Sequence, residues 1–585
     1  MDKSNIMIKK TDLKKTVGII LVLLFLVSSC SGVISLDNVN FFPSFNKDLS
    51  KNHSSNQLSI VNISGGFGID FSLVNEGSKL IKNITIEAKV MGSGLMFPRD
   101  QKKELVMLSP KESANIHLHL FGVGMGDLIK TMDPGRLSDF PLISITASTS
   151  QSELVQKTIA LKIIGPVTII GGEYFNEHGS YEGYTLFAPE YSKYTYLISN
   201  NGEIVHTWKS KYIQGLGAYL LENGDLIRSS LYASASTGFS SGGITGRVEV
   251  LSWDNTKRWD FTYATDEHHL HHDIEVLPNG NILMAAWEYK TAAEAIDAGR
   301  KPDTLKRHCL WPDHIIEVNP DKPDKKNIVW EWHVWDHLIQ EYDSSKQNYG
   351  VVADHPELVD INYMRRDGIP DWNHINSIDY NEEFDQILLS VCNFGEIWVI
   401  DHSTSTEEAA GHTGGRYGKG GDLLYRWGNP QVYQAGNASD QQLFGQHDAQ
   451  WIEHDCPGAG NILIFNNGAE RPGGSYATVD EIKPPVYKNG TYSLNPGHPY
   501  GPEACIWTYS EENPLYAGYT NRLSGAQRLP NGNTLICYGP LGHFFEVKLN
   551  CEKVWQYDNI FPDFFENDVF KIRRYPLNFS GIKIP

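Results

Sequence analysis

Three histidines and one serine occupy the same position in four copies of an internal sequence repeat. When the copies are aligned without gaps on the strand before a turn, this position holds His272, His374, His447 and Ser524. A lone histidine in such a strand is usually a structural residue that satisfies the nearby turn. That explanation fits three histidines in one register poorly, so we expect them to form the functional site. Asn376 lies two positions after the second histidine and could orient the imidazoles.

A ring of imidazoles with few carboxylates suits two kinds of chemistry. Three neutral imidazoles and a water molecule are a known ligand set for catalytic zinc. Alternatively, one imidazole attacks an electrophile, a second transfers a proton, and a third stabilises developing negative charge together with an amide. The spacing of the residues alone does not decide between metal-dependent and nucleophilic catalysis.

The repeats that must position these residues begin after Gly165. Each consists of a strand, a turn and a second strand, and the turn is Asn-Gly in the clearest copies. The five visible copies are residues 221–227, 277–283 and 529–535, with diverged ones after Ile378 and Ile452. Asn-Gly is a strong hairpin signal because type I′ turns need a positive φ at both central residues. We therefore expect type I′ hairpins in these copies.

Short antiparallel repeats of this kind predict an all-β fold, a β-propeller spanning residues 166–585. A sixth blade should combine both ends of this region, with residues 183–187 beside residues 569–573. Closure of that kind protects the edges of the sheets. Six blades are expected, and seven stay open. Equivalent positions on the innermost strands surround the central channel, so the three histidines and Ser524 should converge at one end of it.

Residues 59–165 have a different pattern, which predicts a small N-terminal β-sandwich domain. Apolar and polar residues alternate in residues 84–90, 116–120 and 142–146. Alternation with a period of two is typical of strands that are buried on one face only.

The first thirty residues have the features of an export signal. Five lysines lie in residues 3–15, and residues 17–27 form an apolar run of 11 residues. Such a run is too short to span a bilayer and is typical of a signal peptide, here residues 1–29. A Val-Ser-Ser-Cys sequence ends at Cys30 and resembles a bacterial lipobox, so we expect Cys30 to be lipidated and residues 30–58 to form the anchor and a polar tether. Ordinary cleavage with an incidental cysteine is the alternative.

The leader and the overall charge limit location and partners. We expect an exported protein, in the periplasm or at the cell surface, that contacts the membrane only through its lipid. The chain has a net charge of −20, which becomes −23 without residues 1–29 and their five Lys and two Asp. Such an acidic protein repels phosphate backbones, so a nucleic acid partner is not expected. Assembly as a homodimer stays open.

Six short motifs resemble the arylsulfate sulfotransferase family. They are HHD at residues 271–273, DWNHINS at 371–377, EIWVIDH at 396–402, LYRWGN at 424–429, QHDAQW at 446–451 and SGAQRLPNGN at 524–533. The resemblance covers roughly residues 166–585 and implies a six-bladed propeller preceded by a β-domain. It also implies transfer of a sulfuryl group from a phenolic sulfate ester to a phenol, without a nucleotide donor, a metal or another cofactor.

The resemblance further implies a role for each residue of the ring. His447 matches the nucleophile that becomes transiently sulfated. His272, His374 and Asn376 match residues that handle the sulfate and phenol oxygens, and Ser524 lies where the family can place a hydroxyl. A neutral imidazole, with a pKa of about 6.5, is a competent nucleophile near pH 7. Phenoxide, whose conjugate acid has a pKa of about 10, is a tolerable leaving group.

The chain departs from the family at Cys392, where relatives carry an arginine. That arginine would bind the sulfate and stabilise the transition state, an effect commonly worth a few kcal/mol. Its replacement implies a different donor, a cation supplied by Arg416, Arg528 or Arg573, or loss of activity. Two other functions therefore stay open: a metal-dependent propeller hydrolase or lyase, and a surface binding propeller without catalysis.

Overall fold

The computed structural model describes residues 58–583 with several gaps. The gaps are residues 76, 92–94, 125–141, 149–153, 172–173, 177–178, 203, 233–237, 324–325, 365–367, 512–519, 560 and 562–566. The predicted signal peptide, Cys30 and nearly all of the predicted tether lie outside the described residues. The chain forms two compact units, one that ends at Ile170 and one that begins at Gly171.

The first unit contains two sheets. One has the strand order β1-β2-β6, with β1 (Leu58–Ser64), β2 (Ile69–Asn75) and β6 (Ser113–Leu118). The other has the order β4-β7-β9-β8-β3-β5, with β10 beside β9, and consists of β3 (Ile81–Met91), β4 (Leu95–Phe97), β5 (Asp100–Leu108), β7 (Phe121–Gly124), β8 (Leu142–Ser148), β9 (Leu154–Gly165) and β10 (Val167–Gly171). Phe71 of β2 and Ile145 of β8 belong to one buried apolar cluster, so the two sheets share a core.

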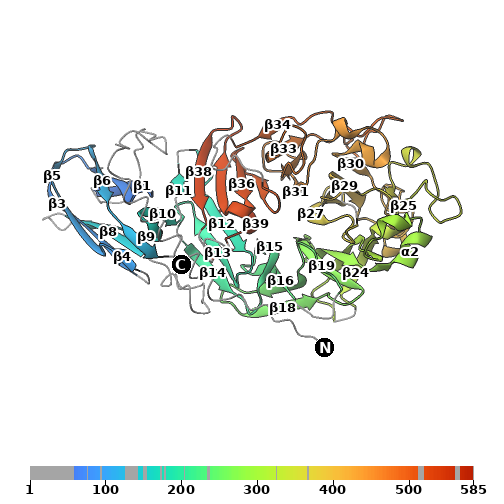
Figure 1. Cartoon of the computed structure of the whole chain (residues 1–585), viewed down its shortest axis with the longest axis horizontal. Helices are drawn as coiled ribbons and strands as arrows, with labels where there is room; N and C mark the ends of the chain where they lie inside the picture. The colour runs from blue at the N-terminus through green and yellow to red at the C-terminus, as the bar shows by residue number, and fades with distance from the viewer. Residues whose placement is uncertain are drawn as a thin grey trace, which may run out of the picture. The chain divides into compact units, whose positions relative to one another are not determined.

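The second unit is a β-propeller, and its described part contains six antiparallel sheets arranged around one centre (Figure 1). The first sheet has the order β14-β13-β12-β39, with β12 (Gly183–Pro189), β13 (Tyr194–Ser199), β14 (Ile204–Lys209) and β39 (Val569–Pro576). The second sheet consists of β15 (Gln214–Leu220), β16 (Leu226–Leu231), β17 (Gly246–Leu251) and β18 (Lys257–Thr262). The third sheet consists of β19 (His268–Val276), β20 (Ile282–Glu288), β23 (Asp313–Val318) and β24 (Ile328–His333).

The next three sheets continue around the centre in chain order. The fourth sheet consists of β27 (Ile375–Asn381), β28 (Gln386–Val391), β29 (Glu396–Asp401) and β30 (Tyr425–Trp427). The fifth consists of β31 (His447–Trp451), β32 (Ile462–Asn466), β33 (Thr478–Ile482) and β34 (Trp507–Tyr509). The sixth consists of β35 (Gly525–Arg528), β36 (Thr534–Tyr538), β37 (His543–Val547) and β38 (Lys553–Asp558), with β11 (Tyr174–Asn176) at the edge beyond β38. The strands β15, β19, β27, β31, β35 and β39 contact one another in a closed ring, which identifies them as the innermost strands.

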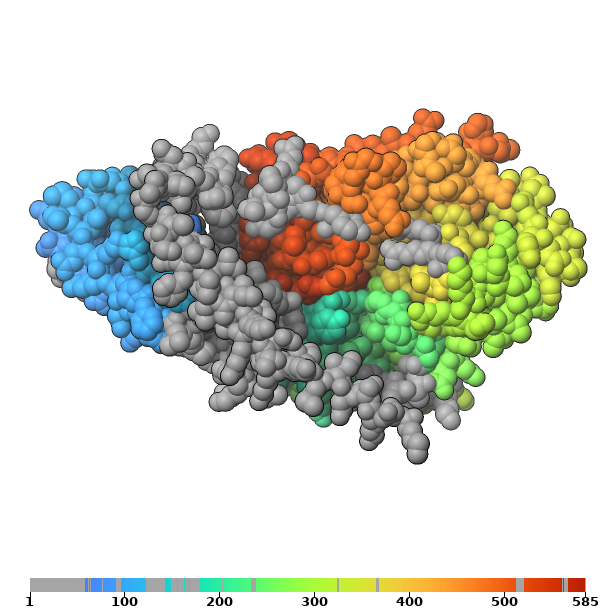
Figure 2. All heavy atoms as spheres, viewed as in Figure 1, coloured from blue at the N-terminus to red at the C-terminus, as the bar shows by residue number. Residues whose placement is uncertain are grey.

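The ring is closed by the two ends of the propeller. Strand β12 pairs antiparallel with β39, so that Leu186 lies opposite Arg573 and Phe187 opposite Ile572. This is the pairing expected from the sequence. In the space-filling view, the orange-red C-terminal part of the propeller lies directly beside its blue-green first part (Figure 2).

The turns inside the sheets differ from the type I′ turns that we expected. Gly280 and Gly532 have φ angles of 83° and 89°, but the asparagine before each is not among the described residues with positive φ. The N–H of Gly280 donates to the carbonyl of Leu277, as in a type I turn followed by a glycine in the left-handed region. The copy at residues 221–225 forms the same turn with Glu222 in place of the proline, because the N–H of Gly224 donates to the carbonyl of Leu221. Asn-Gly therefore ends a three-residue loop, in which only the glycine needs a positive φ.

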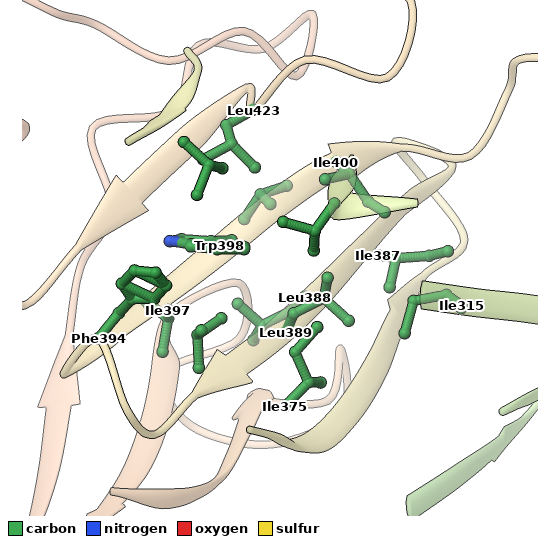
Figure 3. Packing of buried hydrophobic residues seen from close by; sticks show 14 of the residues in the cluster. Ile315, Ile375, Ile387, Leu388, Leu389, Phe394, Ile397, Trp398, Ile400 and Leu423 are labelled. Atoms are coloured by element: carbon green, nitrogen blue, oxygen red, sulfur yellow. The ribbon is translucent and has the colours of Figure 1, made fainter. Parts of the chain in front are cut away.

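Apolar residues between neighbouring sheets form the propeller core (Figure 3). Leu388 and Leu389 of β28 and Trp398 of β29 are fully buried, and Ile315 of β23 joins the same cluster from the preceding sheet. Consecutive residues of a strand point to opposite faces, so both faces of β28 are covered. Burial of each such side chain contributes about 1.5–3 kcal/mol, and this packing holds the inner strands in place.

Short strands, helices and 3-10 turns lie in the loops of the propeller. Two small pairings join β21 (Lys290–Thr291) to β22 (Cys309–Leu310) and β25 (Leu338–Ile339) to β26 (Val359–Asp360). The helices are α2 (Ala292–Asp297) and α3 (Thr406–Ala409), with 3-10 turns η2 (Pro302–Thr304), η3 (Val334–Asp336), η4 (Val352–Asp354), η5 (Pro430–Tyr433), η6 (Ala438–Asp440) and η7 (Gly539–Leu541). Within the described ranges, none of the helices has the length and apolar character needed to cross a bilayer.

Candidate functional site

Three adjacent inner strands bring the predicted histidines together. His272 lies in β19, His374 immediately precedes β27, and His447 is the first residue of β31. The rings of His272 and His374 meet edge to face, with their centroids 4.5 Å apart. His447 lies close enough that its charge acts on His272 and the charge of His374 acts on it. The structure thus gathers all three imidazoles at one place near the propeller axis.

The backbone is unusual at two of these histidines. His272 and His374 have φ angles of 50° and 58°, in the left-handed region that residues with a side chain seldom adopt. Such conformations concentrate at functional sites, because the surrounding structure must hold them in place. Gly243 helps to do so, since its carbonyl accepts a hydrogen bond from the N–H of His272 at 2.7 Å. A Cβ at Gly243 would lie 1.9 Å from Cε1 of His272, so only glycine fits there.

The contacts of His447 determine which of its ring nitrogens can react. Its Nδ1 lies 2.8 Å from Oδ1 of Asn467 and 3.2 Å from the carbonyl of Gly445. The Asn467 amide nitrogen donates to the carbonyls of Thr520 and Leu523, so the oxygen is the atom that faces the ring. Both partners of Nδ1 are acceptors; Nδ1 therefore carries the proton, and Nε2 keeps its lone pair. Burial lowers the pKa of His447 to about 4, which leaves the imidazole neutral at pH 7.

His374 is held by a buried carboxylate. Its Nδ1 donates to Oδ2 of Asp371 at 2.6 Å. Asp371 also accepts hydrogen bonds from the Ser241 hydroxyl and the Trp287 indole. Burial alone would raise the pKa of Asp371, but the His374 charge and these hydrogen bonds hold it below its usual value. An ionised partner at this distance favours the protonated form of His374.

His272 is supported by a second histidine. Its Nδ1 lies 2.9 Å from Nδ1 of His271, whose Nε2 lies 3.2 Å from Oδ1 of Asp313. Burial, followed by the charges of His374, His271 and His447, lowers the pKa of His272 well below the ordinary value. His272 is therefore a neutral imidazole, whereas Nδ1 of His374 is hydrogen-bonded to a carboxylate, so the two rings have different surroundings.

The remaining predicted site residues surround the histidines at different distances. The Asn376 amide nitrogen donates to the carbonyl of Gln446, the residue before His447, so it joins β27 to the start of β31. The backbone N–H of Cys392 donates to the carbonyl of His374 at 3.2 Å, which places position 392 beside that histidine. The Ser524 hydroxyl accepts from the N–H of Gly539, a contact within its own sheet.

Of the three candidate arginines, only Arg573 lies beside the ring. Its guanidinium contacts both carboxylate oxygens of Asp448, at 2.9 and 3.2 Å, and Asp448 directly follows His447. Arg528 instead forms a buried ion pair with Glu481, and Arg416 donates to the carbonyl of Glu383 at an exposed position. Arg573 is therefore the arginine positioned to act near the histidines.

Arg573 belongs to a buried network of alternating charges. Lys571 contacts Asp273 at 2.6 Å and Asp448 at 3.1 Å, and Asp273 directly follows His272. Burial would raise the pKa of Asp448, but the charges of Arg573 and Lys571 lower it to about 2. Two carboxylates, which directly follow two of the histidines in the chain, thus face two cations. The network therefore supplies little net charge of its own.

Sequence reasoning missed several supporting residues. Asp371 lies three positions before His374 inside a recognised motif, so its role could have been inferred. Asn467 contacts His447, Asp313 contacts His271, and Lys571 contacts the aspartates after His272 and His447. All three come from other strands or loops, and no local pattern connects them to the repeat position.

The fold and the site define a class of protein: β-propellers whose inner strands carry a buried cluster of histidines. Within that class, the sequence matches the family model described as Arylsulfotransferase (ASST) over residues 176–559, well over half of the chain. The chain belongs to the arylsulfotransferase family, and the activity of that family is aryl sulfotransfer. No curated protein matches the sequence.

Solved structures resemble the chain only distantly. A protein of unknown function from Bacteroides caccae has 11% identity and a TM-score of 0.36, over 68% of this chain and 99% of that one. A streptogramin B lyase has 9% identity and a TM-score of 0.32, over 66% and 86%. An inactive virginiamycin B lyase from Staphylococcus aureus has 7% identity and a TM-score of 0.30, over 70% and 90%. Likeness at this level carries no argument about function.

Proposed function

We propose that this chain is an aryl-sulfate sulfotransferase that moves a sulfuryl group from a phenolic sulfate ester to a phenol through a sulfated His447. The observation that carries the proposal is the environment of His447. Two oxygen acceptors hold the proton on Nδ1, and burial keeps the ring neutral. The Nε2 lone pair is thereby prepared for attack before a substrate binds.

In the first half-reaction, Nε2 of His447 attacks the sulfur of the donor. An N–S bond forms, the bond between sulfur and the phenolic oxygen breaks, and the phenoxide leaves with the electron pair. His374, whose Nδ1 is hydrogen-bonded to Asp371, acts as the general acid and gives the proton on its other ring nitrogen to that oxygen. The positive charge that develops on the His447 ring is stabilised by the hydrogen bond from Nδ1–H to Asn467.

In the second half-reaction, the acceptor phenol replaces the released phenol. His374 is now neutral and takes the proton of the acceptor hydroxyl, whose oxygen attacks the sulfur. The N–S bond breaks, and its electron pair returns to Nε2 of His447. The products are a new aryl sulfate and the starting enzyme, with His374 protonated again. His272 stays neutral and offers a hydrogen-bonding nitrogen beside the reacting oxygens.

The arrangement of donor atoms supports nucleophilic catalysis over a metal-dependent hydrolase or lyase. In the described part of the chain, three potential ligand atoms of His, Cys, Asp or Glu lie within 4.8 Å of one another only at His337, His412 and Asp422. The three ring histidines do not meet this condition, and Nδ1 of His374 and His447 is already engaged with other residues.

Incubation with a chromogenic aryl sulfate, with and without a phenol acceptor, tests the proposal. We expect phenol-dependent release of the chromophore and, after brief exposure without acceptor, one SO₃ group on the peptide that contains His447. His447→Ala should abolish both signals and leave thermal unfolding unchanged. Equal turnover in this variant would eliminate the covalent mechanism, and ligand binding without turnover in the wild type would favour a binding propeller.

We also propose that the protein is exported and held to a membrane by a lipid on Cys30. The support is the order of the leader, with lysines, an apolar run of 11 residues and a Val-Ser-Ser-Cys sequence. Mass spectrometry of the membrane fraction should find a diacylglyceryl group on an N-terminal Cys30. An unmodified Cys30 in a freely secreted product would contradict the anchor.

A further inference from the structure

Two histidines and an aspartate meet beside the outer strands of the propeller, apart from the histidine ring. His337 directly follows the 3-10 turn η3 after β24, and Asp422 lies shortly before β30. His412 belongs to residues 410–421, the segment between α3 and β30. Strands β24 and β30 are the outermost strands of their sheets, whereas the ring histidines lie on or beside innermost strands.

Both histidines direct the same nitrogen at one carboxylate oxygen. Nδ1 of His337 and Nδ1 of His412 each lie 2.8 Å from Oδ1 of Asp422. All three donor atoms lie within 4.8 Å of one another. Two imidazole nitrogens and a carboxylate oxygen are ligands that zinc takes in proteins, at about 2.0–2.2 Å in a tetrahedral arrangement. Around such an ion the donor atoms would lie about 3.3–3.6 Å apart, so each nitrogen would have to move away from the Asp422 oxygen, which is now 2.8 Å from both.

The other nitrogen of His337 shows why a cation fits between these atoms. Its Nε2 lies 2.9 Å from the carbonyl of Ala409, which can only accept, so Nε2 carries the proton. Nδ1 of His337 is then the nitrogen that faces Oδ1 of Asp422. A divalent cation between them would be coordinated by both atoms. Metal-bound histidines characteristically donate their second N–H to a carbonyl or carboxylate, as His337 does to Ala409.

The neighbouring residues hold two of the three ligands rigidly. The His337 side chain is fully buried and that of Asp422 nearly so, whereas His412 is 59% exposed. The Trp332 indole lies parallel to the His337 ring and donates to the carbonyl of Gly421 at 2.7 Å. A Cβ at Gly421 would lie 2.6 Å from Nε2 of His337, so glycine is needed for the segment to pack against this ring.

We propose that His337, His412 and Asp422 bind one Zn²⁺ ion, with water in the fourth position, and that the ion fixes residues 410–421 to the outer edge of the propeller. This segment contains the six glycines Gly411, Gly414, Gly415, Gly418, Gly420 and Gly421. A glycine-rich segment loses much conformational entropy when it is ordered. The ion offsets that cost by joining the exposed His412 to the buried His337 and Asp422.

Zinc titration of the untagged full-length protein after chelation tests the site. The wild type should bind one Zn²⁺ per chain, and His412→Ala should lower the affinity by more than about 100-fold, because a direct ligand matters at least as much as a supporting residue. His412 is exposed, so this variant should fold. His412→Cys should restore binding, since a thiolate also coordinates zinc. His454→Ala removes an exposed histidine in the hairpin after β31 and should behave as the wild type.

Limited proteolysis supplies a readout that does not depend on activity. Trypsin can cleave after Arg416 and Lys419, both inside the segment. Cleavage there should be slow with zinc, and at least about tenfold faster after chelation or in His412→Ala. If His337 is instead a protonated imidazole paired with Asp422, the wild type will bind no more zinc than His412→Ala, and a chelator will not change the cleavage rate. That result would overturn the proposal.

Discussion

Oδ1 of Asn467 accepts the Nδ1 proton of His447 across 2.8 Å, although the two residues lie on different segments of one blade. The amide nitrogen of Asn467 is held by two backbone carbonyls, so its oxygen cannot turn away from the ring. This contact selects the tautomer in which Nε2 is nucleophilic. An uncharged acceptor achieves this without stabilising the protonated ring as strongly as a carboxylate would.

Asn467→Asp should shift the pH dependence of the reaction. Activity requires neutral His447, whose pKa is about 4. On the acidic side of the pH profile, the wild-type rate should therefore fall as the pH drops through that value. A carboxylate at position 467 stabilises the protonated ring and raises the pKa, so the acidic limb of the profile should move upward by about one unit or more. The rate of the first half-reaction measured from pH 3 to 8 checks this. An unmoved limb would show that another group governs it.

Asp371→Asn should reduce turnover by about 100-fold, because His374 loses the charge that favours its protonated form. The loss should grow as the leaving phenol becomes more basic, since poor leaving groups depend most on proton donation. A series of aryl sulfates with graded phenol pKa values measures this. Asp385→Asn is a matched control, because Asp385 also holds a histidine, His402, at 2.7 Å, but at the end of the sheet opposite His374. An equal loss for all donors would contradict the acid role of His374.

Cys392→Arg should raise sulfotransfer by about tenfold if it recovers about 1.4 kcal/mol of transition-state stabilisation. The backbone of Cys392 contacts that of His374, so an arginine there starts beside the ring. Cys551→Arg, at an exposed thiol, is the control and should change nothing. If Arg573 already serves the sulfate, Cys392→Arg should instead lower kcat/KM by crowding, and Arg573→Ala should be nearly inactive. Neutral results for both Cys392→Arg and Cys392→Ala would show that position 392 does not reach the sulfate.

Lys571→Met should destabilise the fold by about 3–5 kcal/mol, because it leaves Asp273 and Asp448 buried without one of their cations. Lys548→Met removes a partly exposed ion pair with Glu552 and should cost less than about 1 kcal/mol. Denaturant unfolding of both variants measures the difference. Equal effects would mean that the buried network contributes no more than a surface pair.

The fold and the central residues were accessible from sequence for a specific reason. A repeat turns positions that are far apart in the chain into equivalent positions on inner strands, so one alignment identified His272, His374 and His447 together. The type I′ prediction was wrong because Asn-Gly occurs both in two-residue loops and at the end of three-residue loops, where only the glycine needs a positive φ. The hydrogen bond from the Asn376 amide nitrogen to the carbonyl of Gln446 could not be predicted, because it is a contact between blades that no local pattern encodes.

The same limit applies to the cations. Arg573 was one of three arginines proposed as a cation for the sulfate. The sequence could not show which of them lies near the histidines, because that depends on which strand closes the ring. Lys571 could not be singled out either, because a lysine in an apolar strand has no distinguishing neighbours in the chain. Both became recognisable only when β39 was placed beside β15 and β35.

The pairing of β12 with β39 has a consequence for how the protein matures. Residues 571 and 573, which neutralise the aspartates after His272 and His447, are on the last strand of the propeller to be synthesised. Until that strand docks, the two carboxylates face each other without counter-ions, and the inner ring is open. A chain stopped before residue 569, or one still emerging from a ribosome or translocon, therefore lacks both closure and charge balance. Catalytic competence should appear late and all at once, when the C-terminal strand joins the N-terminal end of the propeller.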